Sequence, residues 1–245
     1  MNNNINSISR IHEILLSIAG TSDQRRVLDV WAQAFDVNET EDIKKAALVS
    51  EKLVLLLEEL ELAKNEIEKK FTKNAYNTMV ESLNNAFSPM LLPAGWNSIQ
   101  HYLSSDVMAS LAIYREALPN EEQSINIEEL NELHARMSEL EIFLESSSLP
   151  DRVIQLIKRH IKLIREALSN YKITGAIALI EARRASYGEF FEVKEILQKD
   201  YNPEEISKLK AIWSGLNKLT DGALKAYGLY EIGKEALPAF EQFLK

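Results

Sequence analysis

The longest stretch of helix-compatible sequence constrains the fold of this chain most strongly. Residues 43–71 contain no glycine and no proline, and apolar residues recur in this segment at intervals of seven. This ladder consists of Ala46, Leu53, Leu60 and Ile67. A seven-residue apolar repeat is typical of a coiled coil or of a long helix in a bundle. We therefore predict a long central helix over residues 41–86, and the sequence leaves open whether it is continuous past Thr72.

The composition favours an all-α protein. Of 245 residues, 46% are hydrophobic, whereas only 8 are glycine and 6 are proline, a balance typical of long helices rather than of sheets joined by tight turns. We predict an elongated multi-helix bundle in which shorter helical hairpins pack on the central helix. Periodicity and capping residues predict these further helices over residues 5–18, 21–35, 97–118, 126–146, 148–170 and 176–185, and another that begins at Asn202-Pro203. This order fits two domains, 1–96 and 97–245, or a single domain 1–245.

The charge balance and the absence of cysteine exclude several functions. The chain carries 37 acidic and 28 basic residues, and its net charge of −9 disfavours a general nucleic-acid-binding protein. With 0 cysteines it has no disulfide, thiolate metal site or cysteine nucleophile. An uncharged apolar run such as residues 53–57 is far shorter than the roughly 20 residues that span a bilayer. We expect a cytoplasmic protein.

Two apolar clusters are candidate contact sites. The first is a helix seam on the central helix, which consists of Leu53, Leu57, Leu60 and Ile67. We expect this seam to pack against another helix, either within one chain or in a second copy. The second is a loop over residues 89–96, which contains Met90, Leu91, Leu92 and Trp96. These side chains either cover the end of the bundle or form an exposed docking loop for a partner or a membrane.

Two consecutive predicted helices carry opposite charge. Residues 121–145 contain eight glutamates and one arginine, whereas residues 151–165 contain one aspartate and five basic residues. The basic residues are Arg152, Lys158, Arg159, Lys162 and Arg165. One interpretation is an antiparallel hairpin whose opposite charges attract each other. The alternative is a basic face that binds an acidic partner, a phosphate or RNA.

No motif for catalysis, cofactor binding or metal binding is present. The sequence lacks a Walker-type phosphate loop, a glycine-rich dinucleotide fingerprint and a zinc-protease helix motif. We therefore predict a non-enzyme without cofactor, metal or small-molecule substrate. One enzymatic alternative is a helical ribonuclease of the HEPN type, a class that uses an arginine and a histidine separated by four to six residues. The nearest pair, Arg152 and His160, has seven residues between, which departs from that pattern.

A short segment resembles known proteins. Residues 161–188 contain Arg165, Tyr171, Ile173, Gly175, Leu179, Glu181, Ala182 and Gly188. In this pattern the segment resembles a part of poorly characterised bacterial all-helical proteins of the toxin, immunity or phage-defence type. The resemblance carries no catalytic motif, and it implies a setting in bacterial defence or immunity rather than an activity.

These observations favour a non-enzymatic helical interaction or scaffold protein. We expect it to act through a protein partner or through self-association. We do not expect general binding to nucleic acid. A membrane-active or pore-type helical protein that uses the loop over residues 89–96 is the alternative. The helical ribonuclease is a further alternative.

Overall fold

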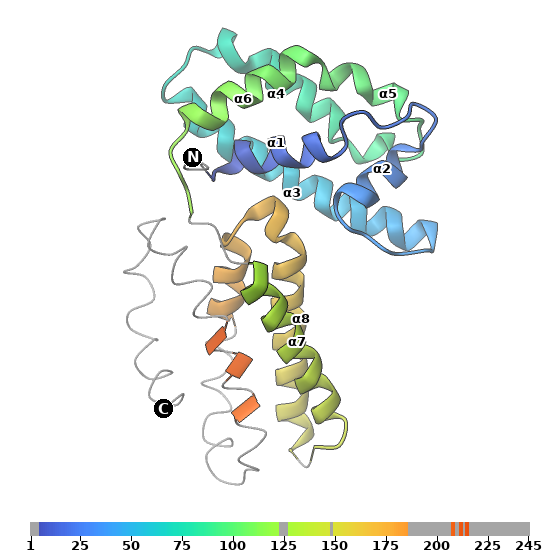
Figure 1. Cartoon of the computed structure of the whole chain (residues 1–245), viewed down its shortest axis with the longest axis vertical. Coiled ribbons are helices and arrows are strands. Elements are labelled where there is room, and N and C mark those ends of the chain that lie inside the picture. The colour runs from blue at the N-terminus through green and yellow to red at the C-terminus, as the bar shows by residue number, and fades with distance from the viewer. Residues whose placement is uncertain are drawn as a thin grey trace. The chain divides into compact units, whose positions relative to one another are not determined.

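The computed structural model describes residues 5–122, 127–147 and 149–185, together with residues 207–208, 211–212 and 214–215 (Figure 1). Across these residues the secondary structure is helical and contains no β-strand, which confirms the predicted all-α class. The helix starts predicted at Asn126, Ser148 and Asn202 lie outside the described residues.

The chain divides into two compact units. Unit 1 comprises Met1–Glu121 and Lys172–Gly175, and unit 2 comprises Glu122–Tyr171 and Ala176–Lys245. These units do not follow the predicted boundary at residue 96. The helices that follow residue 96 belong to unit 1 because their apolar residues lie in its core; these are Ile99, Val107, Leu111, Tyr114 and Leu118.

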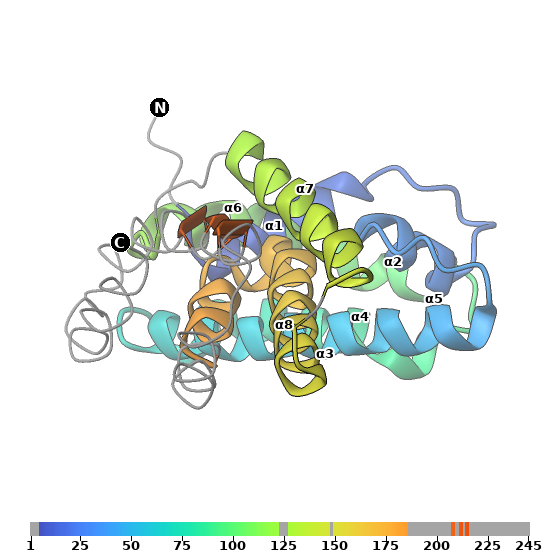
Figure 2. The same ribbon diagram turned by 90° about the horizontal axis from the view of Figure 1, so that it is seen from below.

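Unit 1 is built from α1 (Ser7–Ser17), α2 (Val27–Ala34), α3 (Asp42–Glu68), α4 (Lys73–Ala86), α5 (Asn97–Gln100) and α6 (Ser105–Ala117), with 3₁₀ turns at Pro89–Leu91 and His101–Leu103. Helix α1 packs against α3 and α6, and α4 packs against both α3 and α6 (Figures 1 and 2). The largest fully buried side chains include Trp31, Phe87, Ile8, Ile11 and Leu53. One continuous apolar core thus lies between these helices.

Local sequence explains the start of α1. The Asn6 side chain accepts a hydrogen bond from the backbone N–H of Ser9 at 2.9 Å, and the Ser9 hydroxyl accepts one from the backbone N–H of Asn6 at 2.8 Å. This reciprocal cap satisfies two backbone donors that the first turn leaves unpaired. The apolar face predicted for this helix is buried as expected, and it consists of Ile8, Ile11, Leu15 and Ile18.

The second helix begins at Val27, not directly after residues 21–22 as predicted. The backbone that precedes it pairs instead with the loop that follows α4. The Trp96 N–H donates to the carbonyl of Arg25 at 2.7 Å, and the Val27 N–H donates to the carbonyl of Ala94 at 2.9 Å. These bonds hold the residue before Val27 in an extended conformation, so the helix starts after it.

The predicted central helix over residues 41–86 is divided in two, because residues 69–72 separate α3 from α4. This settles the question, left open by the sequence, of whether the helix is continuous past Thr72. Neither glycine nor proline occurs at this break. A side-chain contact closes the turn instead: the Tyr76 hydroxyl donates a hydrogen bond to the Glu68 carboxylate at 2.7 Å. This bond raises the pKa of Tyr76 to about 12. Because α4 turns back and packs on α3, both helices bury apolar residues that a straight rod would expose (Figure 2).

The predicted helix seam lies inside unit 1. Leu60 is 1% exposed, Leu53 and Ile67 are fully buried, and Leu57 packs half-buried against the same core. The exposed apolar residues of α3 are different ones, among them Leu62 at 52%. The seven-residue spacing is therefore accounted for by packing within one chain.

The predicted helix over residues 97–118 is interrupted at Ser104. This residue has an extended conformation, and its hydroxyl accepts a hydrogen bond from the Val107 N–H at 3.4 Å. Ser104 is therefore the N-cap of α6, a role in which serine is strongly preferred.

A short segment from late in the sequence completes unit 1. Ile173 is 1% exposed and belongs to the core of this unit. The Lys172 ammonium donates a hydrogen bond to the backbone carbonyl of Ala34 at 2.8 Å. Residues Lys172–Gly175 are thus held in unit 1 both by apolar packing and by a polar contact.

Unit 2 contains α7 (Ile127–Leu144), most of α8 (Asp151–Thr174) and a helix over residues 177–185. Gly175 follows α8 with a φ of +62°, a conformation that favours glycine at a helix end. The Glu122 carboxylate accepts a hydrogen bond from the Ala176 N–H at 2.6 Å, so it caps the next helix. The core of this unit includes Leu133, Met137, Leu140, Leu144, Val153, Ile157, Ile161 and Ile164.

Candidate functional site

A buried charge cluster lies in unit 1 around Arg10, which is 8% exposed. One guanidinium nitrogen lies 2.6 Å from the Glu59 carboxylate and 2.9 Å from that of Glu121. Its Nε donates a hydrogen bond to the Ile173 carbonyl at 3.0 Å, and the Ser7 hydroxyl donates to Glu121 at 3.1 Å. Because each of these contacts is within the fold, we interpret the cluster as structural rather than catalytic.

Sequence reasoning missed this cluster. One signal was present, because Glu59 lies on the same face of α3 as Leu56 and Ala63 and is therefore a charged residue on a buried helix face. Its partner Arg10 is 49 residues away in sequence, and Glu121 is 111 residues from Arg10. A single sequence offers no means of pairing residues over such distances.

Helix α1 also contains a buried histidine. His12 is 7% exposed, and its Nδ1 lies 3.4 Å from a guanidinium nitrogen of Arg115. Arg115 also forms an ion pair with Glu13 at 3.0 Å. Burial, and then the positive charge of Arg115, lower the pKa of His12, while Glu13 partly opposes this shift.

We expect the free energy of unfolding to decrease as the pH falls below about 6.5, the usual pKa of an unfolded histidine. The folded-state pKa of His12 is lower, so the unfolded chain takes up a proton first and is favoured, and the loss is complete below the folded-state pKa. Urea unfolding between roughly pH 8 and pH 5.5 measures the slope.

The variant His12→Asn should show a shallower pH dependence than the unmodified chain. His134 in unit 2 also has a lowered pKa, caused by burial and then by Arg165, so His134→Asn is the matched comparison. An unchanged slope in both variants would assign the pH dependence to other groups.

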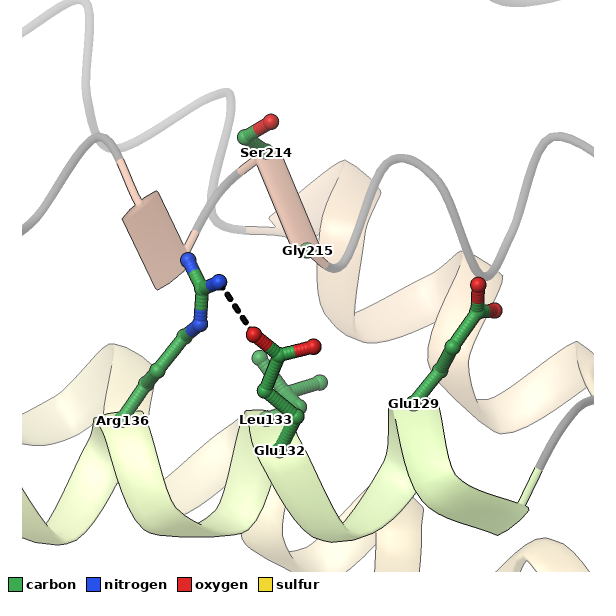
Figure 3. A pocket seen from close by; sticks show the side chains of 6 residues that line it. All are labelled: Glu129, Glu132, Leu133, Arg136, Ser214 and Gly215. Atoms are coloured by element: carbon green, nitrogen blue, oxygen red, sulfur yellow. Dashed lines mark hydrogen bonds and ion pairs between the residues drawn. The ribbon is translucent and has the colours of Figure 1, made fainter.

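Figure 3 shows a pocket in unit 2 with a volume of about 130 Å³, lined by Glu129, Glu132, Leu133, Arg136, Ser214 and Gly215. Arg136 pairs with Glu132 and donates a hydrogen bond to the carbonyl of Ala211 at 3.3 Å. This volume is well below the roughly 300–1,000 Å³ typical of small-molecule sites. Within the described residues, no group of three or more histidine, aspartate or glutamate side chains is placed to hold a metal ion.

The apolar loop is part of the core of unit 1 rather than an exposed tip. Leu92 is buried, Leu91 packs on the core, and Trp96 is 2% exposed, whereas Met90 alone among the predicted docking residues is largely exposed. The Trp96 ring packs edge-on against Trp31 with ring centroids 6.1 Å apart. Of the two interpretations of Met90, Leu91, Leu92 and Trp96, the structure therefore favours a loop that packs on the core over an exposed docking loop. No helix in the described ranges combines the length and apolarity that crossing a membrane requires.

The two helices of opposite charge pair with each other as predicted. Helices α7 and α8 follow one another and lie side by side in unit 2 (Figure 1). The Arg165 guanidinium lies 2.7 Å from the Glu141 carboxylate and donates a hydrogen bond to the Ser138 hydroxyl at 3.1 Å. Arg165 is thus partly used in holding α7 against α8. Pairs of this partly exposed kind stabilise a fold by about 0–1 kcal/mol.

Four further basic residues of α8 form an exposed surface that we call the basic stripe: Arg152, Lys158, Arg159 and Lys162. At roughly 100° per residue, these four positions lie within about 120° of one another around the helix. They face away from the buried side of α8, which contains Val153, Ile157 and Ile164. In the described part of the chain, Lys158 and Lys162 have no ion-pair partner.

The pair considered for ribonuclease activity is not brought together at the surface. Arg152 is exposed, whereas His160 is 3% exposed and lies on the buried side of α8. A phosphate held by Arg152 from solvent would not reach the His160 ring, because burial separates the two side chains. The basic stripe is therefore the candidate functional site that the geometry supports best.

Comparisons with protein-family models, with curated proteins and with solved structures find no match to this chain. The resemblance of residues 161–188 to bacterial defence and immunity proteins accordingly stays a prediction. Residues 186–188 of that segment lie outside the described residues.

Proposed function

We propose that this chain is a non-enzymatic interaction protein whose protein partner binds to the basic stripe of α8. The observation that carries this proposal is the exposure of Arg152, Lys158, Arg159 and Lys162 on one helix face of a chain whose net charge is −9. A local patch of opposite sign attracts an acidic surface and accelerates its association.

The other candidate sites support this choice because each is used within the fold. The helix seam packs in the core of unit 1, and the apolar loop packs against Trp31. The Arg10 cluster satisfies its charges internally. A role in bacterial defence or immunity, which the resemblance of residues 161–188 implies, is compatible with such a protein and stays a prediction.

The test is purification of the tagged full-length chain from its own host, followed by mass-calibrated gel filtration and identification of the proteins that co-elute. The double variant Lys158→Glu/Lys162→Glu reverses two charges of the basic stripe. The matched control Lys69→Glu/Lys73→Glu makes the same change in net charge at exposed positions of unit 1.

We expect a partner that co-elutes with the unmodified chain and the control but not with the stripe variant. Its retention should also weaken as salt is raised above about 0.15 M, because screening reduces attraction between exposed charges. A partner retained equally by the stripe variant would overturn the proposal.

A further inference from the structure

We infer that the partner presents to the basic stripe an acidic α-helix, which lies antiparallel to α8 and carries basic residues at both ends of its acidic segment. This inference rests on the proposed function and specifies the chemistry of the partner at the same site. It is carried by the order of charges along α8, by the way α7 already binds this helix, and by the side chains that the exposed face lacks.

The order of charges along α8 defines the complementary surface. The basic stripe begins at Arg152 and ends at Lys162, a rise of about 15 Å at roughly 1.5 Å per residue. An exposed carboxylate borders it on each side, Asp151 before it and Glu166 after it. Along this face the charges are therefore acidic, then basic, then acidic. A surface of complementary charge has a short acidic segment flanked by basic residues.

Helix α7 supplies the template for how such a segment binds. It is the other arm of the hairpin with α8, and its Glu141 carboxylate lies 2.7 Å from the Arg165 guanidinium. The same guanidinium takes Ser138, one turn earlier on α7, as a second acceptor. A carboxylate and a hydroxyl spaced by one helical turn on an antiparallel helix thus fit one cation of α8, Arg165.

The exposed face extends this arrangement. Lys158 and Lys162 are one turn apart and are both exposed. Glutamates spaced by three or four residues on a facing helix would meet these two cations in the same way. Charged pairs at such an interface set the register and the on-rate more than the affinity, so the pattern of charges is what selects the partner.

The same face is poorly suited to nucleic acid. Among the residues that the structure describes, those exposed within and next to the basic stripe include Gln155, Glu166 and Ser169 but no aromatic side chain on which a base could stack. A phosphate backbone that continued past the basic stripe in either direction would meet the carboxylate of Asp151 or Glu166 and be repelled. A short helix with basic ends avoids both conflicts.

The experiment measures binding of fluorescently labelled synthetic peptides to the full-length chain by anisotropy. The probe is a helix-forming peptide of about 18 residues with glutamates in the middle ten and lysines at both ends, a length that matches the basic stripe and its borders at roughly 1.5 Å per residue. A peptide of identical composition, with the lysines in the middle and the glutamates at the ends, is the control. A uridine oligonucleotide of similar length tests the nucleic-acid alternative.

We expect the probe to bind at least tenfold more tightly than the shuffled peptide. Lys158→Glu/Lys162→Glu should weaken probe binding at least tenfold, and Lys69→Glu/Lys73→Glu should leave it unchanged. Glu166→Lys should weaken the probe as well, because it places a lysine opposite a basic end of the peptide.

The outcomes separate this inference from the proposed function. Equal binding of the two peptides, with both lost in the stripe variant, would overturn the ordered helix and leave the basic stripe as an acidic-partner site. Tighter binding of the oligonucleotide than of the probe, lost in the stripe variant, would overturn both. Self-association of the chain that the stripe variant abolishes would assign the site to a second copy and overturn the inference.

Discussion

Replacing Leu60 by glutamate is expected to unfold unit 1, whereas the same replacement at Leu62 should leave the chain folded. Leu60 is 1% exposed in the core, and Leu62, two residues along the same helix, is 52% exposed. Removing a buried leucine side chain alone costs about 2–5 kcal/mol, and burying a carboxylate without a partner adds to this cost. Their sum is comparable with the whole stability of a typical domain, about 5–15 kcal/mol.

Circular dichroism and urea unfolding of the two full-length variants measure this difference, and gel filtration reports their size. A folded monomer for Leu60→Glu, derived from an unmodified chain that is a dimer, would contradict the structure and place the helix seam between two copies. Substantial loss of stability in Leu62→Glu would contradict it as well, because that side chain would then be buried.

Replacing Glu59 by leucine is expected to lower the free energy of unfolding by about 3–5 kcal/mol, the usual cost of removing one partner of a buried ion pair. Glu59 is 3% exposed, and its loss leaves Arg10 buried with one fewer carboxylate. The double variant Arg10→Met/Glu59→Leu should recover part of the loss, because it leaves neither charge of this pair in the core.

Asp42→Leu is the matched control, because Asp42 pairs with Arg26 at the exposed start of α3 at a similar distance, 2.8 Å. We expect urea unfolding to show little change in this variant. If Glu59→Leu costs no more than Asp42→Leu, the Arg10 cluster does not stabilise the fold as its burial indicates. If the double variant is as unstable as the sum of its single variants, the two side chains are not coupled.

The buried faces of the helices were predictable because helical periodicity is a local property. Ile8, Ile11 and Leu15 on α1 are spaced by three and four residues, and all are buried as expected. The opposite charges of α7 and α8 were equally visible in the sequence, and their pairing through Arg165 and Glu141 follows from adjacency along the chain.

The same reasoning left open whether the central helix is interrupted near Thr72, and periodicity could not decide it. Residues 69–72 include no residue that breaks a helix, and the heptad ladder continues to Ile67 immediately before them. The turn exists because α4 gains more buried apolar surface on α3 than it would as an extension of it, and a bond from Tyr76 to Glu68 closes it. Such a gain depends on packing between segments, which periodicity within one segment does not report.

The candidate site was likewise predictable only in part. The sequence located Arg152, Lys158, Arg159 and Lys162 on one helix face, and exposure follows from the opposite face being apolar. The sequence could not decide whether the apolar loop packs on the core or is exposed, because its position depends on hydrogen bonds from α2 to the backbone at Leu92 and Ala94. An apolar segment that packs in the core and an apolar segment that binds a partner can have the same local sequence pattern.

Because Lys172–Gly175 belong to unit 1, this unit cannot complete its folding until these late residues have been synthesised. A nascent chain released or truncated after Glu121 carries every helix of unit 1 but lacks Ile173, which fills its core and accepts the hydrogen bond of Arg10. The ribosome must therefore have delivered most of α8 before the first unit reaches its final form. Proteolytic fragments that end near residue 121 should accordingly be less stable than unit 1 in the full-length chain, because they lack Lys172–Gly175.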